Sequence, residues 1–162
     1  MKIGVISDTH DRIETTTEAV RLLRKRGAEC ILHCGDIVSA ELVELFAGVP
    51  THFVFGNWDK DRRKLLAAIA AIGGTFHKDF GYLELNGKQI AWVHGDVRGQ
   101  RQELEQLDQF DYLFYGHSHM AESHRTGRTL VLNPGALFRA CPKTCALVDL
   151  NSGKVDLIKV PP

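Results

Sequence analysis

The sequence lacks a surplus of charge of either sign, and it also lacks a long apolar run. Its 162 residues include 20 Lys and Arg against 20 Asp and Glu. Bulk charge therefore gives no reason to expect nucleic acid or an anionic membrane as a partner. No apolar stretch approaches the roughly 20 residues that span a bilayer, so we expect no membrane partner.

The first residues lack the features of an export signal. One basic residue and a short apolar stretch precede Asp8, whereas a signal peptide needs a longer apolar stretch and a small-residue cleavage site. We expect residues 2–7 to form a buried first strand, and we expect the protein to be cytoplasmic.

Cysteine is scarce, with four residues at positions 30, 34, 141 and 145. Two C-x3-C pairs could hold a structural zinc ion. However, Cys30 and Cys34 flank an apolar, strand-like run, where a free cysteine packs as a small hydrophobe. We favour that core role, and we expect no disulfide in a reducing compartment.

Strand and helix patterns alternate in the first half, and strands dominate the second half, where Asn86-Gly87 marks a hairpin. Repeats, low-complexity segments and linkers are absent, so residues 1–162 are expected to form a single domain. The order predicts an α/β fold, a four-layer α-β-β-α sandwich with two packed mixed sheets flanked by helices. Strands are expected over 2–7, 30–34, 52–55, 82–85, 89–93, 112–115, 128–132, 145–150 and 155–160, and helices over 12–26, 39–47, 59–72 and 100–107.

Five of the predicted strands are followed directly by side chains that can bind metals. In open α/β sheets, sites form outside the carboxyl ends of the strands. These side chains are Asp8, His10, Asp36, Asn57, His94, His117 and His119.

Seven candidate ligands exceed the need of one ion and suit two ions that share a bridging carboxylate. Two ions about 3.5–4 Å apart can clamp a phosphoryl group during its displacement. Imidazoles favour transition metals over Mg²⁺ or Ca²⁺. We therefore expect two divalent transition-metal ions as cofactors, with Mn²⁺ as first choice and Ni²⁺, Co²⁺, Fe²⁺ or Zn²⁺ as alternatives.

The order of these motifs along the chain resembles the calcineurin-like metallophosphoesterases. The resemblance covers residues 2 to about 160, and Asn133-Pro134-Gly135 is similar to the small bacterial and archaeal phosphodiesterase branch, to which the retromer subunit of the same fold belongs. The motifs are Asp8-x-His10, Gly35-Asp36, Gly56-Asn57-x-Asp59, His94-Gly95 and Gly116-His117-x-His119.

The resemblance implies a metal-dependent phosphoesterase, with a phosphodiesterase expected, in which a metal-bridging hydroxide attacks phosphorus. Asp36, Asn57 and His94 are the expected catalytic residues, and the substrate is a small phosphate ester, with nucleic acid expected only as a nucleotide-type substrate. Asn57, Trp58 and Arg139 are expected to contact it. One metal would be held by Asp8, His10, Asp36 and His119, and the other by Asp36, Asn57, His94 and His117.

Two positions depart from the family pattern. Trp58 stands where relatives often carry a histidine that is assigned as the general acid or as a phosphate contact, so Asp59 lacks that partner. Asp96 stands where relatives often have a second histidine after His94-Gly95. Since indole cannot donate a proton at neutral pH, we expect the leaving group to be protonated weakly or by water.

Other readings remain open at this stage. A serine hydrolase is disfavoured because the nucleophile-elbow pattern around Ser118 fails at Met120. A non-catalytic interaction scaffold on the same fold is the serious alternative, and exposed strands at the C-terminal edge could pair into a homo-oligomer. The remaining assignments are a structural role for His33, surface or edge positions for His52 and His77, and a solvated helix face for residues 60–64. For His124, five positions after His119, a contact near the site stays open as the less favoured alternative.

Overall fold

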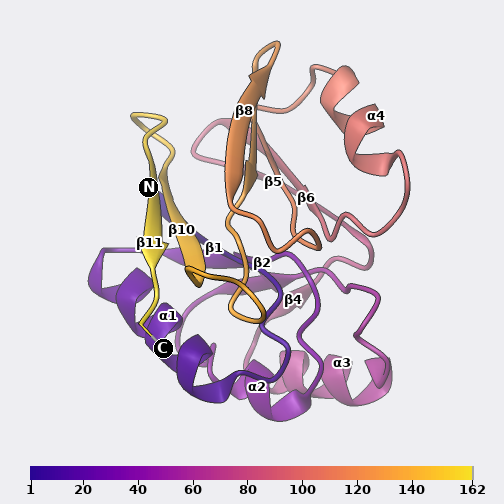
Figure 1. The fold of residues 1–162 in the computed structure, drawn as a ribbon, viewed down its shortest axis with the longest axis vertical. Helices are drawn as coiled ribbons and strands as arrows, with labels where there is room; N and C mark the ends of the chain where they lie inside the picture. Colours follow the sequence, from indigo (N-terminus) through magenta and orange to yellow (C-terminus); the bar gives the residue numbers. More distant parts are fainter. Residues whose placement is uncertain (162) are drawn as a thin grey trace.

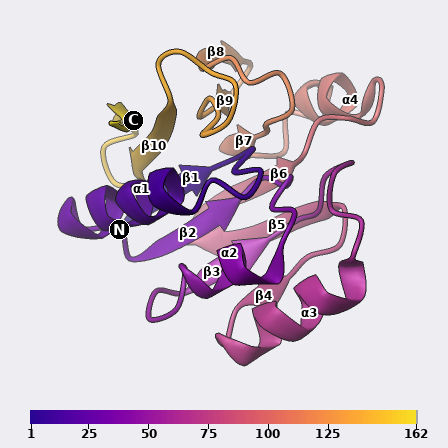
Figure 2. The ribbon, with the colours of Figure 1, turned by 60° about the horizontal axis from the view of Figure 1, so that its bottom comes forward.

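Four layers make up the fold, as the sequence predicts. The computed structural model describes residues 1–161, and helices α1, α2 and α3 cover one face of a six-stranded sheet (Figures 1 and 2). The other face of that sheet packs against a five-stranded sheet, and α4 lies alone beyond it. The helices are α1 (Ile13–Lys25), α2 (Ala40–Glu44), α3 (Arg62–Ala71) and α4 (Gln100–Gln106).

The first sheet has the order β11-β10-β1-β2-β3-β4. Strands β1 to β4 run parallel, while β10 and β11 are antiparallel to their neighbours, so the sheet is mixed. Its strands are β1 (Lys2–Ile6), β2 (Cys30–His33), β3 (Thr51–Phe53), β4 (Thr75–Phe76), β10 (Thr144–Asp149) and β11 (Val155–Lys159).

The second sheet has the order β5-β6-β7-β9-β8 and is also mixed, because β6, β7 and β9 run parallel between two antiparallel edge strands. Asn86 and Gly87 form the turn between β5 and β6, both with positive φ, as the hairpin signal predicts. Its strands are β5 (Phe80–Leu85), β6 (Lys88–Val93), β7 (Tyr112–Phe114), β8 (Glu122–Thr126) and β9 (Thr129–Asn133).

The hydrophobic core lies in separate layers because side chains alternate across each strand. On β1, Ile3 and Val5 face the second sheet, whereas Ile6 faces the helices. On β6, Trp92 is buried between the sheets, whereas Val93 packs on the outer face. No helix within residues 1–161 is long and apolar enough to cross a membrane.

The sequence patterns do not predict two of the strands. β4 has only two residues, too few for a periodic signal. β8, with the sequence ESHRT, is almost wholly exposed and therefore carries no apolar face, and it pairs as an edge strand with β9 across the turn at Gly127. Both are set by tertiary pairing rather than by local composition.

Gly81 is fixed by the packing of the core tryptophan. It pairs directly with Trp92 across β5 and β6, and a Cβ atom at residue 81 would lie 2.1 Å from the indole Cε2. We expect Gly81→Ala to lower the free energy of unfolding by about 3 kcal/mol through overpacking, as measured by urea denaturation. The same change in a Trp92→Phe background should cost clearly less, and an equal cost in both backgrounds would contradict this cause.

Candidate metal centre

The carboxyl ends of parallel strands from both sheets meet at one rim of the sandwich. β1, β2 and β3 of the first sheet, and β6 and β7 of the second, all end there. The loops that follow them bring together all seven side chains that the strand-end pattern selects: Asp8, His10, Asp36, Asn57, His94, His117 and His119.

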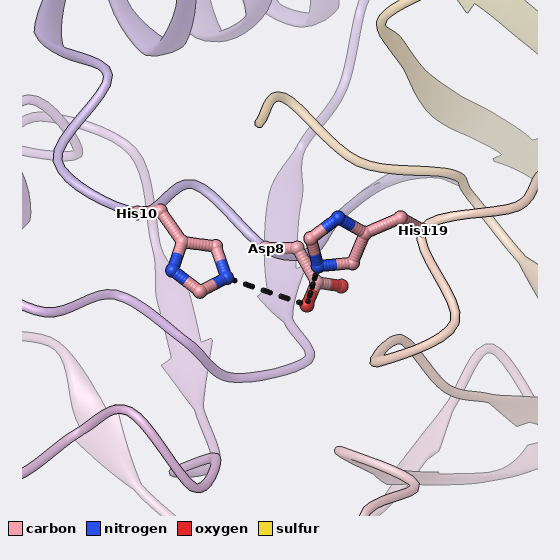
Figure 3. A group of neighbouring side chains, drawn as sticks. All are labelled: Asp8, His10 and His119. Carbon is pink, nitrogen blue, oxygen red and sulfur yellow. Dashed lines mark ion pairs between the residues drawn. The ribbon is translucent and has the colours of Figure 1, made fainter. Parts of the chain in front are cut away.

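The first group of potential ligands centres on Asp8 (Figure 3). The Nε2 atom of His119 lies 3.1 Å from Asp8 Oδ1, and that of His10 lies 3.9 Å from the same oxygen. The other oxygen, Oδ2, accepts hydrogen bonds from the Ser7 hydroxyl at 2.6 Å and the His117 backbone N–H at 3.0 Å. The carboxylate is thus held by one oxygen, and the other faces the imidazoles.

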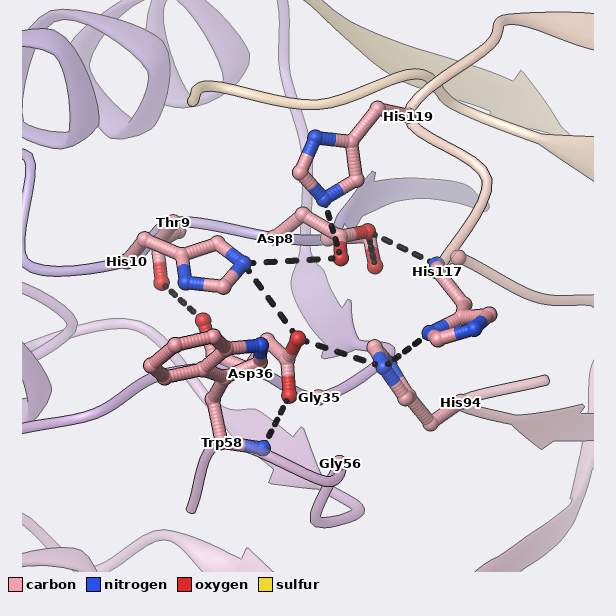
Figure 4. A network of polar contacts seen from close by, with 12 residues as sticks. Asp8, Thr9, His10, Gly35, Asp36, Gly56, Trp58, His94, His117 and His119 are labelled. Carbon is pink, nitrogen blue, oxygen red and sulfur yellow. Dashed lines mark hydrogen bonds and ion pairs between the residues drawn. The ribbon is translucent and has the colours of Figure 1, made fainter. Parts of the chain in front are cut away.

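The second group centres on His94 (Figure 4). Its Nε2 atom lies 3.3 Å from Asp36 Oδ2, 3.1 Å from Asn57 Oδ1 and 3.3 Å from His117 Nδ1. Asp36 Oδ2 also lies 3.2 Å from His10 Nε2, so one carboxylate oxygen joins the two groups.

The tautomer of His94 follows from its surroundings. Its Nδ1 lies 2.8 Å from the carbonyl oxygen of Cys34 and must donate to it. In the neutral ring, Nε2 therefore presents a lone pair to the cluster, as a metal-ligating imidazole does.

The arrangement of these atoms suits a bound cation better than hydrogen bonding among the side chains themselves. Asp8 Oδ1 and His10 Nε2 are buried and make no hydrogen bond to any residue that the structure describes. Two sets of donors, Asp8 with His10 and His119, and Asp8 with Asp36 and His94, each lie within 4.8 Å of one another. Mixed carboxylate, amide and imidazole donors suit divalent transition metals.

The electrostatics of the cluster point the same way. Burial disfavours the charged form of His94, but Asp36 and Asp8 outweigh it and raise the pKa of His94 to about 9. Burial likewise opposes ionisation of Asp36, yet His10 and His94 hold the pKa of that carboxyl well below its usual range. The cluster is therefore a strong attractor of positive charge.

The backbone around the cluster is strained. Five of the seven residues have positive φ, which costs a residue other than glycine roughly 1–2 kcal/mol. Such strain persists only where the surrounding structure enforces it, and it gathers at functional sites. The five are Asp8 (φ 53°), His10 (φ 40°), Asp36 (φ 58°), His117 (φ 67°) and His119 (φ 59°).

Asp59 has a role that the sequence pattern misses. It is buried, and its carboxylate accepts hydrogen bonds from the backbone N–H groups of Asp36, Ile37, Val38 and Gly56, at 2.7–3.0 Å. The absence of a histidine beside it therefore does not leave it without partners. Asp59 fixes the loops after β2 and β3 relative to each other.

Further buried polar residues support the loops. The His33 ring is fully buried, accepts from the Gly35 N–H at 3.1 Å and lies 3.2 Å from the Thr9 hydroxyl, and burial lowers its pKa to about 3. This confirms its structural role. Asn133 donates to the Gly116 carbonyl and to the Ser118 hydroxyl. The sequence positions of His33 and Asn133 do not predict these hydrogen bonds.

The side chains expected to contact substrate lie around this cluster. Trp58 is 58% exposed, its ring centroid lies 5.8 Å from that of His10, and its backbone N–H donates to Asp36 Oδ1. Arg139 lines a pocket of about 430 Å³ together with His119.

The structure agrees with some of the remaining expectations from the sequence and not with others. His124 lies on β8, 3.3 Å from Glu105, rather than at the cluster. His52 and His77 are half-buried, with ring nitrogens 3.0 Å apart. Residues 60–64 are exposed at the start of α3, and Cys30 and Cys34 are buried between the sheets.

Comparisons with known proteins agree with this geometry. The model of the family described as "Calcineurin-like phosphoesterase superfamily domain" matches residues 1–153. The protein named phosphodiesterase MJ0936, from Methanocaldococcus jannaschii, is 29% identical over 138 residues, which cover 83% of each chain. A structure described as a novel archaeal phosphodiesterase superimposes with a TM-score of 0.92 at 26% identity, over 99% of this chain and 100% of that one. Vps29 of Chaetomium thermophilum shares the fold, with a TM-score of 0.72 at 17% identity over 99% of both chains.

The position of Asp59 leads to a test of how the centre is supported. In Asp59→Asn, an amide N–H₂ would face backbone donors, so at least one buried N–H loses its acceptor. We expect the free energy of unfolding to fall by about 2–4 kcal/mol and Mn²⁺ uptake to weaken. Urea denaturation and metal analysis measure the two effects. Asp61→Asn, on the exposed N-cap of α3, should leave Mn²⁺ uptake unchanged, and normal uptake by Asp59→Asn would contradict the role of Asp59.

Proposed function

Because the chain belongs to the calcineurin-like phosphoesterase superfamily, we propose that it is a phosphodiesterase that hydrolyses a small phosphate ester with two divalent transition-metal ions. Relatives named phosphodiesterase support the type of reaction. The observation that carries the two-ion part is the convergence of seven donor side chains from both sheets. Two buried atoms among them, Asp8 Oδ1 and His10 Nε2, have no hydrogen-bond partner in the part of the chain that the structure describes. We propose that the 162 residues act as one domain.

The seven donors would divide between two ions, with Asp36 available to both. Its Oδ2 atom lies within 3.3 Å of ring nitrogens from both groups, which suits a bridging carboxylate. Asp8, His10 and His119 would complete one site, and Asn57, His94 and His117 the other. Mn²⁺ is the first choice, with Ni²⁺, Co²⁺, Fe²⁺ or Zn²⁺ as alternatives. Two bound ions supply an activated water and stabilise charge on the phosphate.

The chain's own groups orient the substrate. Asn57 presents Oδ1 to His94, which leaves its amide N–H₂ to donate to a phosphate oxygen. Asp36 and His94 would hold the ions that position the attacking water. Trp58 and Arg139 flank the cluster and would contact the organic part of the ester or its charge.

We infer that neither Trp58 nor Asp59 acts as a general acid. Trp58 stands where the family resemblance implies a histidine, and Asp59 is buried with four backbone N–H donors on its carboxylate. Neither can deliver a proton to the departing alkoxide, so protonation falls to water. The proposal therefore includes a preference for esters with good leaving groups.

One observation favours a second function, a non-catalytic interaction scaffold. Trp58 is a large apolar side chain exposed at the rim of the cluster, as a protein-binding surface would present it. The competent donor set argues for the enzyme, and the following test separates the two.

Purified protein with Mn²⁺ should hydrolyse bis-p-nitrophenyl phosphate, and Asp36→Ala should reduce the rate by about a thousandfold or more, because it removes the shared ligand. Chelation should abolish activity, and Mn²⁺ should restore it. Asp156→Ala, at a partly exposed acid of β11 outside the candidate centre, serves as the control. If the wild-type chain binds no metal and gives only background hydrolysis, the scaffold replaces the enzyme.

A series of aryl and alkyl phosphodiesters tests the missing general acid. Because no side chain protonates the leaving group, we expect log kcat/KM to fall steeply as the leaving-group pKa rises. In Trp58→His, the slope should flatten as activity on poor leaving groups improves. A wild-type rate that does not depend on leaving-group pKa would show that some other group donates the proton.

A further inference from the structure

Phe138 lies beside the candidate metal centre, and the guanidinium groups of two arginines lie over its ring. Its ring centroid lies 4.6 Å from that of His10 and 6.2 Å from that of His119. The Cζ atoms of Arg12 and Arg139 lie 4.6 Å and 4.9 Å from the same Phe138 centroid. The two arginines come from opposite ends of the chain, since Arg12 precedes α1 and Arg139 follows the loop after β9.

Neither arginine has an acidic partner. Arg21, Arg62, Arg101 and Arg128 each lie within 4.0 Å of a carboxylate, whereas Arg12 and Arg139 make no ion pair within residues 1–161. Two acids adjoin Arg12 in sequence, Asp11 and Glu14, and both are exposed and unpaired with it. Stacking on an aromatic face leaves the N–H edges of a guanidinium available to a planar anion.

The two arginines also stay clear of the buried carboxylates of the centre. Asp8 and Asp36 are the strongest anions nearby, yet neither guanidinium comes within ion-pair distance of them. Phe138 therefore holds both cations outside the space enclosed by the seven donors. They suit an anionic group that lies beyond the ester that is cleaved.

Other positive charge surrounds this position. Arg12 is the N-cap residue of α1, a helix of 13 residues whose N-terminus bears partial positive charge. The Lys143 ammonium lies 3.3 Å from the Thr15 hydroxyl in the first turn of that helix. Arg139 and His119 also line one pocket of about 430 Å³, so this arginine and a candidate metal ligand border the same open space.

We propose that Arg12 and Arg139, stacked on Phe138, form a second anion site that binds a further phosphate or carboxylate of the substrate. This inference rests on the proposed function. It narrows the substrate class to phosphodiesters that carry a second anionic group some distance from the ester. Arg12, which no sequence motif selects, becomes a specificity-determining residue.

Linear alkyl bisphosphates of two to six carbons test this site without a nucleobase or a turnover step. Binding to Mn²⁺-loaded protein is measured by calorimetry, beside the matching alkyl monophosphates and ω-carboxyalkyl phosphates. At one chain length, a second anionic group should tighten binding about tenfold, as charge-assisted hydrogen bonds to arginine do. The bisphosphate and carboxylate arms then show which anion the site prefers.

Arg12→Ala and Arg139→Ala should each remove most of that gain. Arg21→Ala, which deletes one charge from the exposed face of the same helix α1, should retain it. The inference is overturned if no chain length shows a gain, if the gain survives both substitutions, or if monophosphates weaken as much as bisphosphates. That last result would place the arginines on the cleaved phosphate instead.

These outcomes are separable from failure of the proposed function. Absence of ester hydrolysis with a retained, arginine-dependent gain would overturn the enzyme and leave the anion site standing. Ester hydrolysis without an arginine-dependent gain in binding would instead overturn the anion site and leave the proposed enzyme standing.

Discussion

Carboxylate oxygens and imidazole nitrogens are crowded together where the two sheets meet, and the site depends on the loops that hold them there. These atoms converge from four strand ends, and two of them, Asp8 Oδ1 and His10 Nε2, make no hydrogen bond within residues 1–161. The surrounding polar network opposes relaxation. Ser7 and the His117 N–H fix one oxygen of Asp8, and the Cys34 carbonyl fixes the tautomer of His94. Under the proposed function, a bound cation would satisfy the atoms that lack a hydrogen-bond partner.

Much of the fold and the centre could be predicted from the sequence because both follow from local patterns. Apolar strands followed at once by Asp, Asn or His marked the rim, and parallel strands bring such ends to one edge. Supporting groups carry no comparable signal. Asp59 finds four backbone donors that exist only once two loops have folded together. Phe138 and Arg12 meet across 126 positions of the chain (138 minus 12), and β8 lacks an apolar face.

Trp58, one of the two departures from the family pattern, lies beside the seven candidate donors rather than among them. The donor set is complete, while Trp58 changes what borders it and the arginine pair on Phe138 adds charge beside it. Under the proposals above, Trp58, Arg12 and Arg139 would serve recognition without binding metal, whereas Asn57 would serve both roles. A scaffold built in this way can keep one reaction and exchange its substrates through a few side chains on loops.

Both sheets contribute candidate metal ligands to the same rim, and under the proposed function this has a consequence for the folded chain as a whole. Asp8 and Asp36 belong to loops of the first sheet, and His94, His117 and His119 to loops of the second. Ions seated between them would cross-link the halves of the sandwich at one end, in addition to the apolar contacts between the sheets. Resistance to heat would then rise with the free concentration of metal, because ligands that bind only the native state shift the unfolding equilibrium. Scarcity of metal would loosen the sandwich at this rim first.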